Sequence, residues 1–379
     1  MNVRKTVLPQ LSRGVSRPSI SRWLGLTLII LLLLGLSGRP ADVQAQSGNI
    51  RFDRISIEDG LSQSTIYAIL QDRQGFMWFG TQDGLNKFDG YRFTVYKNDP
   101  DDPNTITDNF IRAIYEDHAG NLWIGTNGGL NRFDPNTETF TRFQHDPDDP
   151  QSLSDNIVRA IYEDEEGVMW LGTGSGGLNR FDPATGAFTT YRADVNRAGS
   201  LSHDNVWTLY EDSTGVLWVG TEGGGLDKFD PATESFIAYQ HDPNNPASLS
   251  NNDVSSIIED STGNLWVGTA GGGLDKFDRS KETFTVYHFD AEDPASLSDD
   301  NVRYLYEDGA GRLWVGTRSG GLNRFDPATQ SFDRFLNDPA NPHSLSANHV
   351  VTIYEDRGGV LWFGTNGAGL NKFNRAREA

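Results

Sequence analysis

The side chains best able to bind a ligand stand at two positions that vary among seven copies of an otherwise regular pattern. The first column lies just after the first apolar residue of a short stretch, and it holds Tyr67, Arg112, Arg159, Trp207, Ser255, Arg303 and Val351. The second column follows a Gly-Thr pair, and it holds Gln82, Asn127, Gly174, Glu222, Ala270, Arg318 and Asn366. Arginine forks bind carboxylates and sulfates through paired hydrogen bonds, and aromatic faces stack on sugar rings.

The polar and aromatic members of these columns are therefore predicted to bind a ligand. They are Tyr67, Arg112, Arg159, Trp207, Arg303, Gln82, Asn127, Glu222, Arg318 and Asn366. The expected ligand is a small molecule or an oligosaccharide, and the arginines favour a carboxylated or sulfated sugar. The alternative is that both columns are merely exposed and therefore unconstrained.

Patterns typical of catalysis or cofactor binding are weak. None of the seven histidines falls in a His-Glu-x-x-His frame. Gly172, Gly174 and Gly177 match Gly-x-Gly-x-x-Gly, but they join two predicted strands, whereas a dinucleotide site needs a strand followed by a helix. The chain has no cysteine, which excludes disulfides and thiolate metal sites. We predict no catalytic residue, metal or cofactor. The alternative is a propeller polysaccharide lyase or glycosidase, with Glu222 as the one plausible acid.

A repeat centred on tryptophan fixes the spacing of both columns. Each tryptophan lies in the frame acid-x-x-Gly-x-apolar-Trp-apolar-Gly-Thr, followed by Gly-Leu-(Asn/Asp)-(Lys/Arg)-Phe. The seven are Trp78, Trp123, Trp170, Trp218, Trp266, Trp314 and Trp362. One copy predicts strands at 158–163, 168–173, 177–181 and 188–192, with Gly167 left-handed in the first turn. No helix is predicted after residue 50.

Four short strands per copy, repeated seven times, predict an all-β fold, a seven-bladed β-propeller with four antiparallel strands per blade. The seventh copy lacks its fourth strand, whereas Phe52–Ile55 matches Phe332–Phe335 of the sixth copy. The N-terminal strand, at about 51–56, is therefore expected to close the last blade. The propeller is placed at 46–379, with Trp-centred blades at about 61–96, 106–143, 153–192, 201–240, 249–288, 297–336 and 345–373.

Residues 1–45 are predicted to be a secretory signal peptide. A basic segment precedes an apolar run from Trp23 to Leu36, and small residues precede a cleavage site after Ala45. The mature chain is then periplasmic or secreted, and it is membrane-anchored only if this segment is not cleaved. The chain carries 32 Lys+Arg against 52 Asp+Glu, a net charge of −20. This balance argues against nucleic acid as a partner, because phosphate binding rests on cations.

The repeated unit Tyr-Glu-Asp-x-x-Gly-x-Leu-Trp-Val-Gly-Thr-x-Gly-Gly-Gly-Leu-(Asn/Asp)-(Lys/Arg)-Phe resembles the two-component regulator propeller repeats, over residues 51–373. Such repeats occur in periplasmic sensor regions of hybrid histidine kinases and related diguanylate cyclases. The resemblance implies an extracytoplasmic ligand-binding or scaffold module with a sensor kinase or cyclase as partner. Because the chain ends at Ala379, we expect a free-standing or truncated sensor module without kinase or cyclase activity of its own.

Overall fold

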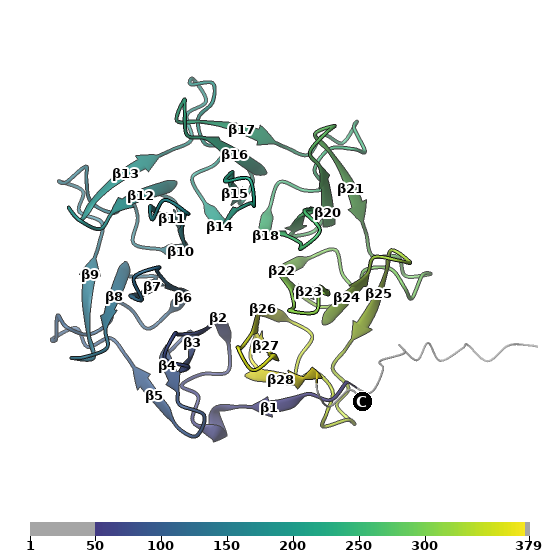
Figure 1. Cartoon of the computed structure of the whole chain (residues 1–379), viewed down its shortest axis with the longest axis horizontal. Coiled ribbons are helices and arrows are strands. Elements are labelled where there is room, and N and C mark those ends of the chain that lie inside the picture. The colour runs from purple at the N-terminus through teal and green to yellow at the C-terminus, as the bar shows by residue number, and fades with distance from the viewer. Residues whose placement is uncertain (1–49, 376–379) are drawn as a thin grey trace, which may run out of the picture. The chain divides into compact units, whose positions relative to one another are not determined.

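The computed structural model describes residues 50–375, which form seven four-stranded antiparallel sheets around a central channel (Figure 1). The predicted signal segment at 1–45 lies outside the described residues. The elements are β1 (Asp53–Ile55), η1 (Ile57–Asp59), β2 (Ile66–Gln71), β3 (Met77–Thr81), β4 (Gly84–Phe88), β5 (Phe93–Tyr96), β6 (Ile111–Glu116), β7 (Leu122–Thr126), β8 (Leu130–Asp134), β9 (Thr139–Phe143), β10 (Val158–Glu163), β11 (Met169–Thr173), β12 (Leu178–Asp182), β13 (Ala187–Tyr191), β14 (Val206–Glu211), β15 (Leu217–Thr221), β16 (Leu226–Asp230), β17 (Ser235–Tyr239), β18 (Val254–Glu259), β19 (Leu265–Thr269), β20 (Gly273–Asp278), β21 (Thr283–Tyr287), β22 (Val302–Glu307), β23 (Leu313–Thr317), β24 (Leu322–Asp326), β25 (Ser331–Phe335), β26 (Val350–Glu355), β27 (Val360–Thr365) and β28 (Leu370–Asn374).

The predicted fold class is confirmed. Blades 1 to 6 each consist of four consecutive strands, from β2–β5 in blade 1 to β22–β25 in blade 6, and blade 7 consists of β26, β27, β28 and β1. The four strands predicted for the third copy match β10 to β13 to within one residue. Gly167 is left-handed as predicted, with φ of 81°. The one departure is η1, a single 3-10 turn that Ser56 caps through the backbone N–H of Glu58.

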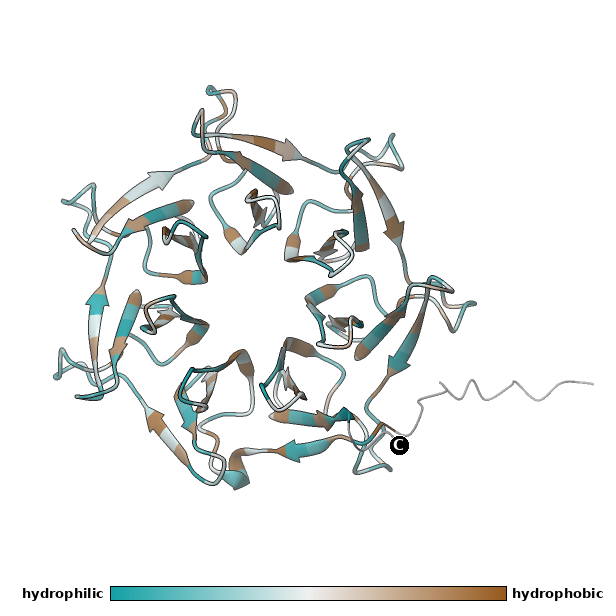
Figure 2. Ribbon diagram, in the orientation of Figure 1, coloured by the Kyte–Doolittle hydropathy of each residue, from teal (hydrophilic) through white to brown (hydrophobic). Residues whose placement is uncertain are grey.

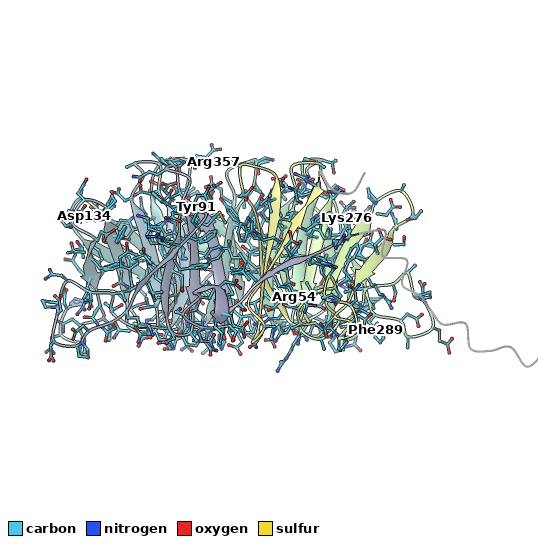
Figure 3. The ribbon with its side chains drawn as sticks, turned by 90° about the horizontal axis from the view of Figure 1, so that it is seen from below. Arg54, Tyr91, Asp134, Lys276, Phe289 and Arg357 are labelled. Atoms are coloured by element: carbon cyan, nitrogen blue, oxygen red, sulfur yellow. The ribbon has the colours of Figure 1, made fainter. Side chains whose placement is uncertain are left out.

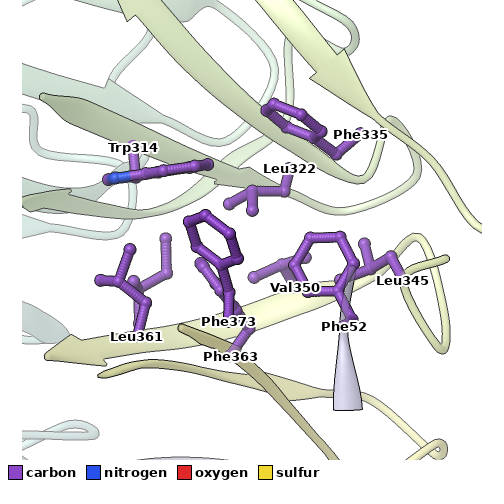
Figure 4. Packing of buried hydrophobic residues seen from close by; sticks show 10 residues of the cluster. Phe52, Trp314, Leu322, Phe335, Leu345, Val350, Leu361, Phe363 and Phe373 are labelled. Atoms are coloured by element: carbon purple, nitrogen blue, oxygen red, sulfur yellow. The ribbon is translucent and has the colours of Figure 1, made fainter. Parts of the chain in front are cut away.

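The N-terminal strand closes the ring, as the sequence predicted. β1 pairs antiparallel with β28, with Arg54 opposite Asn371. The backbone N–H of Phe52 donates to the carbonyl of His343 at 2.9 Å, just as Phe332 in blade 6 donates to the carbonyl of Ala295. The ring of Phe52 packs into the hydrophobic cluster that blade 7 shares with Trp314 of blade 6 (Figure 4). The last blade is therefore closed by the same kinds of contact as blade 6, although β1 pairs over three residues and β25 over five.

Each blade is tied together by a buried hydrogen bond between its tryptophan and its aspartate. The indole Nε1 donates to the aspartate Oδ2 at 2.7–2.9 Å in all seven blades: Trp78 to Asp72, Trp123 to Asp117, Trp170 to Asp164, Trp218 to Asp212, Trp266 to Asp260, Trp314 to Asp308 and Trp362 to Asp356. The other carboxylate oxygen accepts a backbone N–H four residues on, as from Val168 to Asp164. The aspartate thus closes the first turn and fixes the indole.

The tryptophan packs on the next blade as well as on the fourth strand of its own, as Trp123 does on Phe143. Trp123 of blade 2, for example, lies in a cluster with Val158, Leu171 and Phe181 of blade 3. At the seam, Trp362 of blade 7 packs with Ile66 and Phe79 of blade 1. Figure 2 shows the hydrophobic segments on the strands of every blade, where these clusters form. The core is consequently a ring of seven interfaces, each shared between neighbours.

The glycine of each Gly-Thr pair permits this close approach of blades. A Cβ added to Gly172 would lie 2.6 Å from Val206 of the next blade, and one added to Gly268 would lie 2.6 Å from Val302. At the seam, a Cβ on Gly364 would lie 2.9 Å from Ile66. Only glycine fits where two backbones or a backbone and a side chain come this close.

Removal of the Phe52 ring tests the closure. Phe52 is 2 % exposed and Phe332, its counterpart in blade 6, is 5 % exposed. Phe52→Ala and Phe332→Ala are each expected to lower the free energy of unfolding by about 3–5 kcal/mol, because both leave a cavity in an inter-blade core. Denaturant unfolding measures both losses, with the exposed Ile57→Ala as control. A large loss for Phe332→Ala with almost none for Phe52→Ala would mean that β1 is not part of blade 7.

Candidate functional site

The first column occupies a β-bulge in every inner strand. In blade 1, Ile66 pairs with Thr81 and Ala68 pairs with Gly80, which leaves Tyr67 without a cross-strand partner. The same register shift leaves out Arg112, Arg159, Trp207, Ser255, Arg303 and Val351. A bulge re-aims the side chain of its extra residue. The sequence identified this column by its variability, but the bulge that places it is visible only in the strand register.

These bulges open on the central channel, which holds a cavity of about 330 Å³. Tyr67, Arg112, Arg159, Trp207 and Ser255 line it, together with residues deeper in the inner strands. The remaining two residues of the column, Arg303 and Val351, are not among the residues that line this cavity. The guanidinium of Arg303 instead lies 5.6 Å from the ring centroid of Trp207, although blade 5, with its small Ser255, stands between their blades.

The second column meets the first in blades 1 and 2. The Gln82 amide donates to the Tyr67 hydroxyl at 2.9 Å, and Arg112 Nε donates to Asn127 Oδ1 at 2.5 Å. In blade 4, Glu222 accepts a hydrogen bond from Asn205 instead of from a first-column residue. These two columns therefore lie at the same end of the channel.

The two other predicted residues of the second column lie in blades 6 and 7. Arg318 is exposed, and its positive charge acts on Arg303 of the first column. Asn366 is also exposed; it accepts from Thr65 Oγ1 at 3.2 Å and contacts His349 Nδ1 at 3.1 Å. The structure thus groups the predicted residues around one mouth, although no single cavity holds them all.

A third variable column, which the sequence reasoning missed, completes this mouth. It lies two residues before the bulge and holds Thr65, Phe110, Ile157, Asn205, Asp253, Asn301 and His349. In blades 2 to 7, its carbonyl accepts the backbone N–H of the second-column residue at 2.8–3.2 Å. Phe110 shows its use: its ring lies 4.9 Å from that of Tyr67 and 4.5 Å from the Arg112 guanidinium. Its variation among copies was the available signal.

Unpartnered polar atoms gather at this mouth. Seven buried side-chain nitrogen or oxygen atoms in residues 50–375 have no hydrogen-bond partner, and five of them belong to the first and third columns: Arg159 Nε, Asn205 Oδ1, Trp207 Nε1, Asn301 Oδ1 and His349 Nε2. A buried polar group left without a partner costs about 1–3 kcal/mol. Such groups in a native protein call for an explanation, such as an ordered water or ion, a reservoir of strain or a functional role.

The mouth is also a local concentration of positive charge. Burial, followed by the neighbouring charge of Arg159, lowers the pKa of Arg112 to about 10. Burial also lowers the pKa of Arg159, and the carboxylate of Glu222 opposes this effect. The pKa of Arg303 is lowered by burial and then by Arg318. Arg112 therefore remains cationic at neutral pH, in a chain whose net charge is −20.

The opposite end of the channel is acidic, and its acids are engaged in structure. In the side view, Arg357 of the β26–β27 turn lies at one end and Phe289 of an outer connection lies towards the other (Figure 3). At the Arg357 end, the last residue of six inner strands accepts a backbone N–H from the neighbouring blade, whereas Glu211 Oε2 in blade 4 has no hydrogen-bond partner. Six such acceptors at 2.6–3.0 Å are Glu116, Glu163, Glu259, Glu307, Glu355 and, at the seam, Gln71.

Neither a metal-binding cluster nor a membrane-spanning helix is found in the described residues. Within residues 50–375, no group of three or more His, Cys, Asp or Glu side chains is arranged to hold a metal ion. The same part of the chain contains no helix long and apolar enough to cross a bilayer.

The fold and the channel define a seven-bladed propeller with one cationic, aromatic mouth and one acidic, structurally engaged mouth. The family model of the two component regulator propeller matches every blade, at residues 60–83, 105–128, 152–175, 200–223, 248–271, 296–319 and 344–367. The chain belongs to the two-component regulator propeller family, as its repeats indicated.

Known relatives agree with this assignment and are much longer. Histidine kinase P4 of Formosa agariphila is 48 % identical over 65 residues, which are 17 % of this chain and 5 % of that protein. The extracellular domain of a protein assigned to the hybrid two component systems of B. thetaiotaomicron is 32 % identical, with a TM-score of 0.74. The match covers 86 % of this chain and 42 % of that one. The chain therefore spans less than half the length of each of these two proteins.

More distant structures share the fold alone. Virginiamycin B lyase from Staphylococcus aureus is 14 % identical, with a TM-score of 0.61 over 86 % of this chain and 98 % of the lyase. Identity this low carries no catalytic residue across. In this chain Glu222, the one acid considered for a lyase or glycosidase, is bonded to Asn205 and lies among arginines.

Quenching of Trp207 fluorescence tests the potential at the mouth. The seven frame tryptophans are at most 5 % exposed, whereas Trp207 is half-buried. Iodide is expected to quench the Trp207 emission about threefold or more better than caesium, because local positive potential concentrates anions. The difference between wild type and Trp207→Phe isolates this emission, and added salt should reduce the iodide preference. Equal quenching by the two ions would contradict a cationic mouth.

Proposed function

We propose that this chain is an extracytoplasmic sensor module that binds an anionic saccharide, or another small polyhydroxylated anion, at the cationic mouth of its channel. The observation that carries the proposal is the set of five buried, unpartnered polar atoms at that mouth. These atoms, together with the neighbouring arginines and aromatic rings, lie at positions that vary between blades. The remaining columns of the repeat build the cores.

The unpartnered atoms require a ligand with both donors and acceptors. Arg159 Nε and Trp207 Nε1 are donors without acceptors. Asn205 Nδ2 donates to Glu222, which fixes the orientation of the amide, so the unpartnered Asn205 Oδ1 is an acceptor. Sugar hydroxyls both donate and accept, whereas a simple inorganic anion only accepts. Carboxylate or sulfate groups would pair with the arginine forks.

The neutral state of His349 supplies a further donor. Asn366 Oδ1 accepts from Thr65, so its amide nitrogen faces His349 Nδ1 and donates to it. Burial, then the charges of Arg303 and Arg318, lower the pKa of this histidine. Neutral His349 then carries its proton on Nε2, the unpartnered atom at the mouth.

The proposed partner and compartment rest on the similarity to an extracellular sensor domain. We propose that the propeller transmits ligand binding to a sensor kinase or cyclase, as expected of a domain similar to an extracellular region of a hybrid two component system.

Export would use the predicted signal segment at 1–45. N-terminal sequencing of exported protein is expected to begin at Gln46; an intact Met1 in the membrane fraction would indicate an anchor instead.

Removal of the arginines tests the site. Arg112→Ala, Arg159→Ala and Arg303→Ala combined are expected to weaken binding of an anionic oligosaccharide more than a hundredfold, since a hydrogen bond to a charged group contributes about 1.5–3 kcal/mol. Calorimetry would use oligogalacturonate and a chondroitin sulfate disaccharide as carboxylated and sulfated probes, with a neutral cello-oligosaccharide for comparison.

A matched variant controls for net charge. Alanine at the exposed Arg92, Arg180 and Arg197 removes the same charge away from the channel. This variant should bind the anionic probes as wild type does. Binding that survives the channel variant unaltered would place the ligand elsewhere.

A further inference from the structure

A polar residue lies fully buried in the third strand of every blade, directly after the leucine of the Gly-Leu pair. It is asparagine in five blades and aspartate in two, and all seven side chains are 0 % exposed: Asn86, Asn131, Asn179, Asn323 and Asn371, with Asp227 in blade 4 and Asp275 in blade 5. A buried carboxylate is far more costly than a buried amide unless it is paired. The two aspartates therefore occupy a site built for a neutral side chain.

In blades 1, 2 and 7, the asparagine starts a chain of hydrogen bonds that runs through a serine or threonine hydroxyl to the threonine of the Gly-Thr pair. In blades 3 and 6, the asparagine donates to the corresponding serine hydroxyl. Asn86 Nδ2 donates to Ser62 Oγ at 2.8 Å, Ser62 Oγ lies 2.9 Å from Thr81 Oγ1, and Thr81 donates to the carbonyl of Gly84. Since Thr81 uses its proton on Gly84 and Ser62 accepts from the amide, Ser62 must donate to Thr81. The chain ties the loop before the inner strand to the loop between the second and third strands.

Aspartate can continue this chain only when it is protonated. Ser202 Oγ lies 2.5 Å from Asp227 Oδ2 and 3.2 Å from Thr221 Oγ1. An ionised Asp227 would take the single proton of Ser202, and Thr221 would lose its donor. A protonated Asp227 would donate to Ser202 and restore the order seen with asparagine. Blade 5 repeats the arrangement, with 2.5 Å between Ser250 Oγ and Asp275 Oδ2.

No counter-charge is available to pair with an ionised Asp227. Lys228 and Asp230 lie on the same strand, Glu222 follows β15, and His203 and Asp204 lie in the preceding loop. None of them contributes to its pKa, which burial raises to about 7 against the opposing hydrogen bonds of Ser202. Asp227 Oδ1 has no partner at all.

Asp275 has an equally uncharged environment. Lys276 and Asp278 lie on the same strand, Asp253 lies in the preceding loop, and β19 is followed by Ala270. Burial raises the pKa of Asp275 to about 7, with only the hydrogen bonds of Ser250 opposing it. Both carboxyls therefore change their charge near neutral pH.

We propose that Asp227 and Asp275 are a proton-operated switch beneath the channel mouth: protonated, they lock the loops of blades 4 and 5, and ionised, they release them. The released loops carry site residues, since Thr221 directly precedes Glu222 and Ser202 lies three residues before Asn205. This inference goes beyond the proposed ligand binding and does not depend on it. It makes the propeller itself responsive to the pH outside the cytoplasm.

The sign of the stability change follows from the raised pKa. Between the ordinary value of 3.8 and about 7, the folded state keeps protons that the unfolded chain has released. Stability from each carboxyl is therefore complete below pH 4, falls as the pH rises towards 7 and is constant above it. From pH 5 to pH 8, the folding equilibrium constant should fall by about tenfold or more for each aspartate.

Denaturant unfolding at pH 5 and pH 8 tests the switch. The double variant Asp227→Asn with Asp275→Asn should fold, since five blades already carry asparagine, and should lose less stability than wild type between pH 5 and 8. The converse variant Asn179→Asp, in blade 3, should be destabilised at pH 8 and nearly unaffected at pH 5. The proposal is overturned if the double variant keeps the wild-type pH dependence or fails to fold.

Hydrogen exchange locates the effect. After correction for the intrinsic pH dependence, amides of 222–224 in blade 4 should exchange faster at pH 8 in wild type, whereas those of 127–129 in blade 2 should not. In the double variant Asp227→Asn with Asp275→Asn, the amides of 222–224 and 127–129 should show the same pH dependence of exchange. Equal protection of 222–224 at both pH values in wild type would also overturn the switch.

Discussion

The bond between a buried indole and a buried aspartate is the interaction on which the other contacts of this propeller depend. Burial by itself raises the pKa of such a carboxyl, yet hydrogen bonds from Thr214, Trp218 and Arg279 hold that of Asp212 at about 2. The charged aspartate thus accepts hydrogen bonds from its own turn and fixes the indole against the next blade. Because every core is shared by two blades, no blade is complete without its neighbour, and the ring must close.

This shared packing decides where the sequence is free to vary. A residue paired across a sheet and buried between blades is constrained on every side. A bulge residue has no cross-strand partner, and the residues on either side of the mouth meet only each other and the channel. Chemical asymmetry therefore accumulates at Arg112, Arg159, Trp207 and Arg303 while Gly-Thr and Trp remain unchanged from blade to blade.

The sequence alone predicted the blades, because its seven repeats can be aligned with one another. The likeness of Phe52–Ile55 to a fourth strand was sufficient to predict closure, and turn chemistry predicted the left-handed Gly167. The same alignment identified two variable columns but not the bulge, which follows from strand register rather than from residue type. The third column also varies among the copies, and the sequence reasoning missed it. Asp227 and Asn179 look interchangeable in the sequence, and only the structure shows that both are fully buried, which raises the pKa of Asp227 to about 7.

The two mouths also explain how a strongly acidic protein could hold an anion. Most acids at the far mouth accept backbone hydrogen bonds between blades, so they stabilise the ring while remaining negative. Their long-range field opposes the approach of an anion, and salt screens that field over about 10 Å. The arginines act at short range inside the channel, where burial has already removed part of their water. Folding thus already supplies part of the free energy needed to desolvate the arginines. Short-range contacts at the cationic mouth would then determine the affinity for the proposed anion.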